Sequence, residues 1–120
     1  MSRVPLVQGD VMLFPVDDTT VPTAPIAARD VRNLIVLGLG EATGHAHVIA
    51  DADVTLYQET ADAVDRWLRV GQAGATFSHV LSDGSTRADH HAIPIPAGLY
   101  RVIQQVEYQP GPVPRRIVAD

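Results

Sequence analysis

Short runs of β-prone residues recur along the whole chain, about ten residues apart, and glycine, proline or aspartate separates them. No segment between them carries a strong helical signal. A chain of this kind builds sheets from consecutive short strands, so the sequence predicts an all-β fold, either a small single-domain β-barrel or a β-sandwich. The expected strands cover residues 4–7, 11–16, 33–39, 45–49, 54–58, 65–70, 75–81 and 99–108, with a further alternating stretch at 90–98.

Two segments also allow a helix. One is residues 27–37, and the other is residues 60–70, where Thr60 offers a capping oxygen and two alanines add helix propensity. A strand is favoured in the first segment because Gly38 and Gly40 end it. A strand is favoured in the second segment because every neighbouring element also suits a sheet.

The length of the chain predicts one domain. With 120 residues, of which 46% are hydrophobic, there is enough apolar material for one core and too little for a second. We expect a single β domain over residues 1–120, with a proline-rich tail from about residue 109. Gly9-Asp10 is a turn pair between the first two strands, and residues 17–28 and 82–89 are expected to be surface loops.

Composition excludes several classes of function. The net charge of −5, with only nine Lys and Arg residues, argues against nucleic-acid binding, which needs a basic face. The chain has no cysteine, so disulfides, cysteine-based metal sites and thiol nucleophiles are excluded. It also lacks a signal-peptide pattern and any run of eighteen apolar residues. We therefore expect a cytoplasmic protein without a membrane partner.

The five histidines fall in three places, each at or beside an expected strand: His45 with His47, His79 alone, and His90 with His91. Side chains at positions i and i+2 of a strand point to the same face, about 6.5–7 Å apart. His45 and His47 are therefore expected to share a face with Ile49, and that face is predicted to be the site. The other face, with Ala46, Val48 and Ala50, is predicted to be the core.

Neutral imidazoles that converge on one point bind divalent transition metals, here zinc or else iron, nickel or copper. The carboxylates available to such a site are Glu41 and Asp89. Because neighbouring strand residues point to opposite faces, at most one of His90 and His91 can join it. Affinity should fall as the pH drops through the histidine range near about 6.5. Replacing His45 and His47 together by alanine should abolish binding while the fold persists.

The sequence resembles a family of short bacterial proteins to which no activity is assigned. The resemblance rests on a pattern of glycines, histidines, prolines and tyrosines, found here at residues 40–47, His79, Asp89-His90, 96–100 and 105–110. Its acidic-residue–histidine element matches Asp89-His90, which selects His90 rather than His91. With this choice, the metal set predicted from the clustered histidines is His45, His47, His79 and His90 with Glu41.

A weaker likeness is to cupins, which place a His-x-His after glycine in their first motif. The second cupin motif carries a histidine soon after Pro-x-Gly, and here Leu99-Tyr100-Arg101 follows Pro96-Ala97-Gly98 instead. The cupin likeness is therefore an analogy.

The sequence predicts a small metal-binding β-protein whose reaction, and whether it is an enzyme at all, stay open. The alternative is a non-catalytic oligomeric or accessory β-barrel, either a homo-oligomer or bound to another protein, whose histidines line an interface. A His-x-His pair is also typical of hydrogen-bonded structural histidines, and Glu41 is equally suited to holding a loop through backbone N–H groups. No P-loop, dinucleotide fingerprint or Gly-x-Ser-x-Gly elbow occurs.

Overall fold

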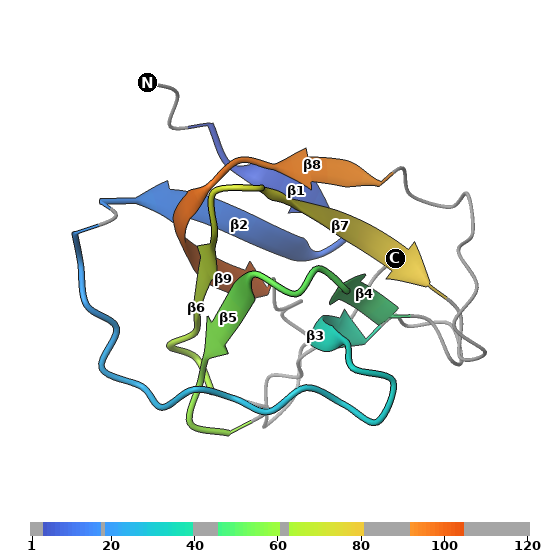
Figure 1. The fold of residues 1–120 in the computed structure, drawn as a ribbon, viewed down its shortest axis with the longest axis horizontal. Coiled ribbons are helices and arrows are strands. Elements are labelled where there is room, and N and C mark those ends of the chain that lie inside the picture. Colours follow the sequence, from blue (N-terminus) through green and yellow to red (C-terminus); the bar gives the residue numbers. More distant parts are fainter. Residues whose placement is uncertain (1–3, 18, 40–45, 61–62, 81–91, 105–120) are drawn as a thin grey trace, which may run out of the picture.

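The computed structural model describes residues 4–17, 19–39, 46–60, 63–80 and 92–104 (Figure 1). Within these residues the chain forms nine β-strands and no helix, which confirms the predicted all-β class. None of the described segments is a helix long and apolar enough to cross a membrane. The expected tail from residue 109 and the expected loop at 82–89 lie outside the described residues.

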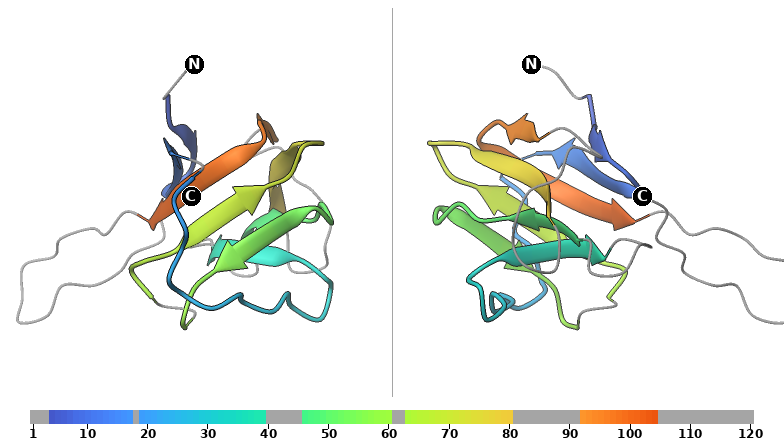
Figure 2. Two further views of the ribbon diagram at one scale, coloured as in Figure 1. Left: turned by 60° about the vertical axis from the view of Figure 1, so that its left-hand side comes forward. Right: turned by 90° about the vertical axis from the view of Figure 1, so that its right-hand side faces the viewer.

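The strands form two antiparallel sheets, which we call the large sheet and the small sheet (Figures 1 and 2). In spatial order, the large sheet consists of β1 (Leu6–Gln8), β2 (Val11–Val16), β9 (Gly98–Gln104), β6 (Trp67–Val70) and β5 (Val54–Tyr57). The small sheet consists of β3 (Ile35–Leu39), β4 (Ala46–Ile49), β7 (Ala75–Val80) and β8 (Ile93–Ile95).

The described strands make an open sandwich, and no hydrogen-bonded ladder joins the two sheets into a closed barrel. The edge strands β1 and β8 lie side by side where the sheets meet (Figure 1). Each run predicted as a strand overlaps one, and within the segment 60–70 the described residues form strand β6 at its end and no helix. Residues 27–34 contain no helix either.

The core lies between the sheets and follows the period-2 alternation of the strands. Its fully buried members include Leu13 of β2, Leu68 of β6 and Phe77 of β7. On β9, Tyr100 and Val102 are buried in the same core, and the Tyr100 hydroxyl donates a 2.6 Å hydrogen bond to the Pro96 carbonyl. Burial raises the pKa of Tyr100.

The hairpin that joins β1 to β2 turns at Gly9 and Asp10, as the sequence predicts. Gln8 pairs with Val11, which leaves these two residues as the loop. Gly9 has a φ of 59° at the first loop position, as in a type II′ turn, where glycine avoids the clash that a Cβ would cause. Asp10 is only 4% exposed, so this turn places a carboxylate in the interior.

Gly38 allows β3 to approach the large sheet closely. The register between β3 and β4 shifts between Val36 and Gly38, as at a β-bulge. A Cβ on Gly38 would lie 2.7 Å from Cγ2 of Val11 and 3.3 Å from Nε2 of Gln104. Because residue 38 has no side chain, the small sheet can lie close to the ends of β2 and β9.

We expect Gly38→Ala to lower the free energy of unfolding by about 1–3 kcal/mol, because the added methyl overpacks a rigid, buried valine. Chemical denaturation measures this change. Unchanged stability would contradict the close contact between Gly38 and Val11.

Candidate functional site

His47 and His79 lie directly opposite each other on neighbouring strands of the small sheet. They are register partners in the antiparallel pair β4–β7. Their imidazole rings stack with centroids 4.8 Å apart and an angle of 27° between the planes. The two residues are 0% and 2% exposed, respectively. Two histidines predicted to belong to one site are therefore adjacent and buried.

The other predicted metal ligands, His45, His90 and Glu41, lie outside the described residues, as do Asp89 and His91. Among the residues that the structure does describe, no three His, Asp or Glu side chains are grouped so as to hold a metal ion.

Both faces of β4 are buried, and the face that carries His47 points toward the main core between the sheets. His47 and Ile49 are fully buried, and the His47 ring lies 6.1 Å from the Phe77 ring of the main core. The opposite face points away from the large sheet, and on this outer face Ala46 and Val48 form a second buried apolar cluster with Val80, as predicted, whereas Ala50 is exposed. His47 can be buried because the interior provides a polar partner for its imidazole.

That partner is Gln8, at the end of β1 in the opposite sheet. Its Nε2 donates a 3.0 Å hydrogen bond to the carbonyl of Phe77, which fixes the orientation of the amide. Its Oε1 then lies 2.8 Å from Nδ1 of His47 and acts as the acceptor, so Nδ1 carries the proton. In the neutral ring, Nε2 of His47 is therefore the nitrogen with the lone pair.

Nε2 of His47 faces the carboxylate of Asp10. The distance from Nε2 to Oδ1 is 3.8 Å, and both side chains are almost completely buried. The second carboxylate oxygen, Oδ2, accepts a 2.9 Å hydrogen bond from Nε2 of Gln104 at the end of β9. Within the part of the chain that the structure describes, no hydrogen-bond donor reaches Oδ1. Gln8 at the end of β1 and Asp10 in the β1–β2 turn thus approach His47 from the other side of the sandwich, and Gln104 of β9 holds Asp10 in place.

Sequence reasoning missed these three residues. Gly9-Asp10 was recognised as a turn, but a Gly-Asp pair is typical of exposed turns, and its sequence does not indicate that the carboxylate points inward. The period-2 pattern places Gln8 on the same side of β1 as Leu6, which gives a weak signal for burial. Gln104 shares a face with Tyr100 and Val102, and this alternation indicates its direction but not its partner.

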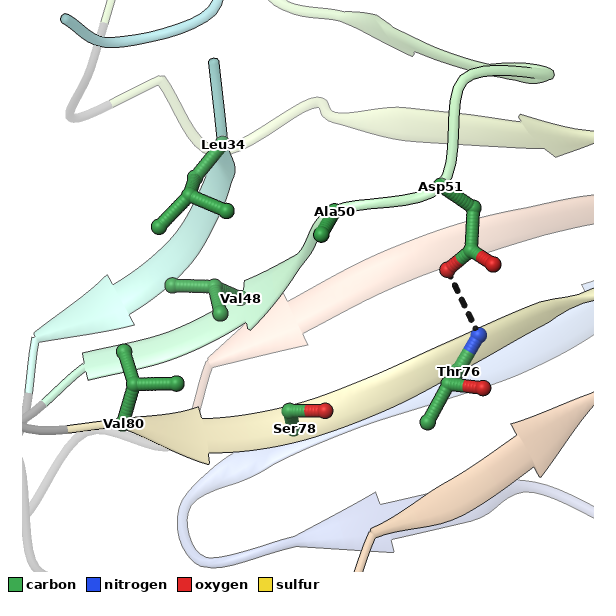
Figure 3. Close-up of a pocket in the computed structure, with 7 residues that line it drawn as sticks. All are labelled: Leu34, Val48, Ala50, Asp51, Thr76, Ser78 and Val80. Carbon is green, nitrogen blue, oxygen red and sulfur yellow. Dashed lines mark hydrogen bonds between the residues drawn. The ribbon is translucent and has the colours of Figure 1, made fainter. Parts of the chain in front are cut away.

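A second feature is a hollow of about 480 Å³ on the outer face of the small sheet (Figure 3). Asp51 and Thr76 lie at one end of it, where Oδ1 of Asp51 accepts a 2.9 Å hydrogen bond from the Thr76 backbone N–H. Because strand residues alternate, the hollow lies on the opposite face from His47 and His79. Its lining residues are Leu34, Val48, Ala50, Asp51, Thr76, Ser78 and Val80.

The fold and the buried cluster define a small antiparallel β-sandwich with a histidine–carboxylate network between its two sheets. A family model described as "Domain of unknown function (DUF8820)" matches residues 7–105. The chain therefore belongs to the DUF8820 family, in agreement with the expected membership of an uncharacterised family. The match does not bear on the residue pattern or the cupin likeness noted above. No curated protein and no solved structure matches the chain.

Proposed function

We propose that this protein binds one divalent transition metal ion, such as zinc or ferrous iron, at a centre that includes His47 and His79. The observation that supports this most directly is the stacked, buried pair of imidazoles. Two imidazoles more than about 8 Å apart could not share an ion at bond lengths of about 2 Å, and these rings are 4.8 Å apart. The remaining ligands in this proposal are those predicted from the sequence, His45, His90 and Glu41.

The hydrogen bond from His47 to Gln8 also supports metal binding. A metal-ligating histidine usually donates its other ring N–H to a carbonyl or carboxylate, which fixes the tautomer and the ring orientation. Gln8 Oε1 takes this role at Nδ1, and it leaves Nε2 as the nitrogen that can bind an ion. The orientation and tautomer of His47 are thus set before an ion binds.

Burial favours a metal site over the alternative in which the histidines line a subunit interface. Interface side chains are exposed in the separate subunit, whereas His47 and His79 are buried within the chain itself. These two imidazoles are therefore inaccessible to a partner protein that docks on the surface.

We expect untagged protein to retain about one metal ion per chain after dialysis and to melt at a higher temperature with zinc or ferrous iron than with a chelator. An ion that binds only the folded state stabilises it by about 2.7 kcal/mol at a concentration 100 times its Kd. Elemental analysis and thermal melting measure the two effects. Protein that contains no metal and melts at the same temperature under both conditions would refute the proposal.

A further inference from the structure

We infer that the hollow on the outer face of the small sheet binds a small amphipathic primary amine. The ammonium group of this ligand meets the carboxylate of Asp51, and its aliphatic body lies against Val48 and Val80. The inference is independent of the proposed metal centre, because the hollow lies on the other face of the sheet from His47 and His79.

The lining of the hollow changes from polar to apolar along its length (Figure 3). Thr76, Ser78 and Val80 follow one another on the outer face of β7, about 6.5–7 Å apart. Val48 packs with Val80 at the apolar end, and Asp51 lies beside Thr76 at the polar end. Such a lining fits a ligand that has one apolar end and one polar end.

The hollow has the size of a small-molecule site. Its volume of about 480 Å³ lies within the range of roughly 300–1,000 Å³ that is typical of such sites. Val48 and Val80 line it as part of a packed apolar cluster with Ala46. An aliphatic ligand that lies against these valines leaves water for apolar surface, which favours binding in proportion to the area that it buries.

The polar end carries a negative charge that no cation of the described residues neutralises. Oδ1 of Asp51 accepts the hydrogen bond from the Thr76 N–H, which orients the carboxylate, and Oδ2 accepts none from the described part of the chain. The guanidinium of Arg29 donates to the backbone carbonyls of Asp51 and Val54 and does not pair with this carboxylate. The polar end therefore favours a cationic group.

The acceptors at this end favour a primary amine over a quaternary one. A primary ammonium group donates three hydrogen bonds, and the carboxylate of Asp51 and the hydroxyls of Thr76 and Ser78 provide three acceptors. Neither hydroxyl is hydrogen-bonded to another of the described residues. Quaternary ammonium ions are instead recognised by aromatic rings, and none of the seven residues that line the hollow is aromatic.

The test titrates isotope-labelled protein with hexylammonium chloride and follows the backbone amide signals by NMR. Hexanol and hexanoate are the neutral and anionic ligands with the same chain. We expect saturable shifts at Val48, Thr76 and Ser78, and a Kd for hexylammonium about tenfold or more below that for either control, because hydrogen bonds between charged groups are the strong ones. Hexanol that binds as tightly as hexylammonium, or the absence of saturable shifts at these amides, would overturn the inference. Shifts of the same amides on raising the protein concentration alone would assign the hollow to a second copy of the chain and would also overturn it.

Asp51→Asn tests the charge at the polar end. Asparagine keeps an oxygen that accepts the Thr76 N–H, so the change removes the charge and preserves this contact. We expect the Kd for hexylammonium to rise about tenfold or more and that for hexanol to stay the same. The matched control is Asp65→Asn, at a side chain that is 78% exposed and pairs with Arg101 of the large sheet. It should leave both values within about twofold. Unchanged hexylammonium binding in Asp51→Asn would contradict the contact with Asp51.

Ser78→Leu tests the place of binding. A leucine at this position fills the hollow between its polar and apolar ends, next to Val48 and Val80. We expect this variant to keep the melting temperature of the wild type and to bind neither hexylammonium nor hexanol. A folded Ser78→Leu protein that binds hexylammonium as the wild type does would place the ligand elsewhere and overturn the inference.

Discussion

Replacing His47 with alanine is expected to abolish metal binding and to lower the free energy of unfolding by about 3–5 kcal/mol. The imidazole is fully buried, so its removal leaves a cavity next to Phe77. It also removes the donor that Oε1 of Gln8 uses in the interior. The sequence predicted that joint replacement of His45 and His47 would spare the fold if the pair is a site and not part of the core, and the burial of His47 predicts a loss of stability instead. Calorimetric titration with Zn²⁺ and chemical denaturation measure the two effects.

Because a destabilised variant can lose metal indirectly, Val48→Ala is the matched control. Val48 is the next residue on β4, is 2% exposed, and points to the outer face, away from His47. Its truncation should also reduce stability, by about 1–3 kcal/mol, but it should leave zinc affinity within twofold. Zinc binding that survives in His47→Ala, or that is lost equally in Val48→Ala, would contradict a role for His47 as ligand.

The strands of this fold could be predicted because each is signalled locally. Alternation such as Val11 and Leu13 in β2, or Leu68 and Val70 in β6, places one face of each strand in the core. The division into two sheets could not be predicted in the same way. The central strand β9 pairs with β2 and β6, which lie far from it in the chain, and the sequence carries no local signal for such pairings.

The site was predictable only in part, because it too depends on the pairing of strands that lie far apart in the chain. His47 and His79 stand out as rare residues on expected strands, but their contact depends on the pairing of β4 with β7. Which face of β4 points inward also depends on packing, because all four residues of this strand are buried. Asp10 enters the site only because the Gly9 turn directs it into the sandwich, and turn chemistry alone does not specify that direction.

Gln8→Leu is expected to lower the free energy of unfolding by about 2–4 kcal/mol and metal affinity by about 10–100-fold. Leucine has a similar volume, so the change removes polar contacts and leaves no large cavity. One lost contact is the bond to the Phe77 carbonyl, which links β1 of the large sheet to β7 of the small sheet. The other is the acceptor for Nδ1 of His47, which fixes the tautomer. Denaturation and zinc titration measure the effects, and Gln72→Leu at an exposed position should change neither.

Gln8→Glu separates the two contacts of Gln8. A glutamate at position 8 keeps an oxygen acceptor for Nδ1 of His47 but has no N–H to donate to the Phe77 carbonyl. We therefore expect Gln8→Glu to lose stability as Gln8→Leu does, while its zinc affinity stays within about threefold of the wild type, because the acceptor still orients the ring. Equal losses of affinity in both variants would mean that Gln8 acts by holding the sheets together and not by setting the tautomer of His47.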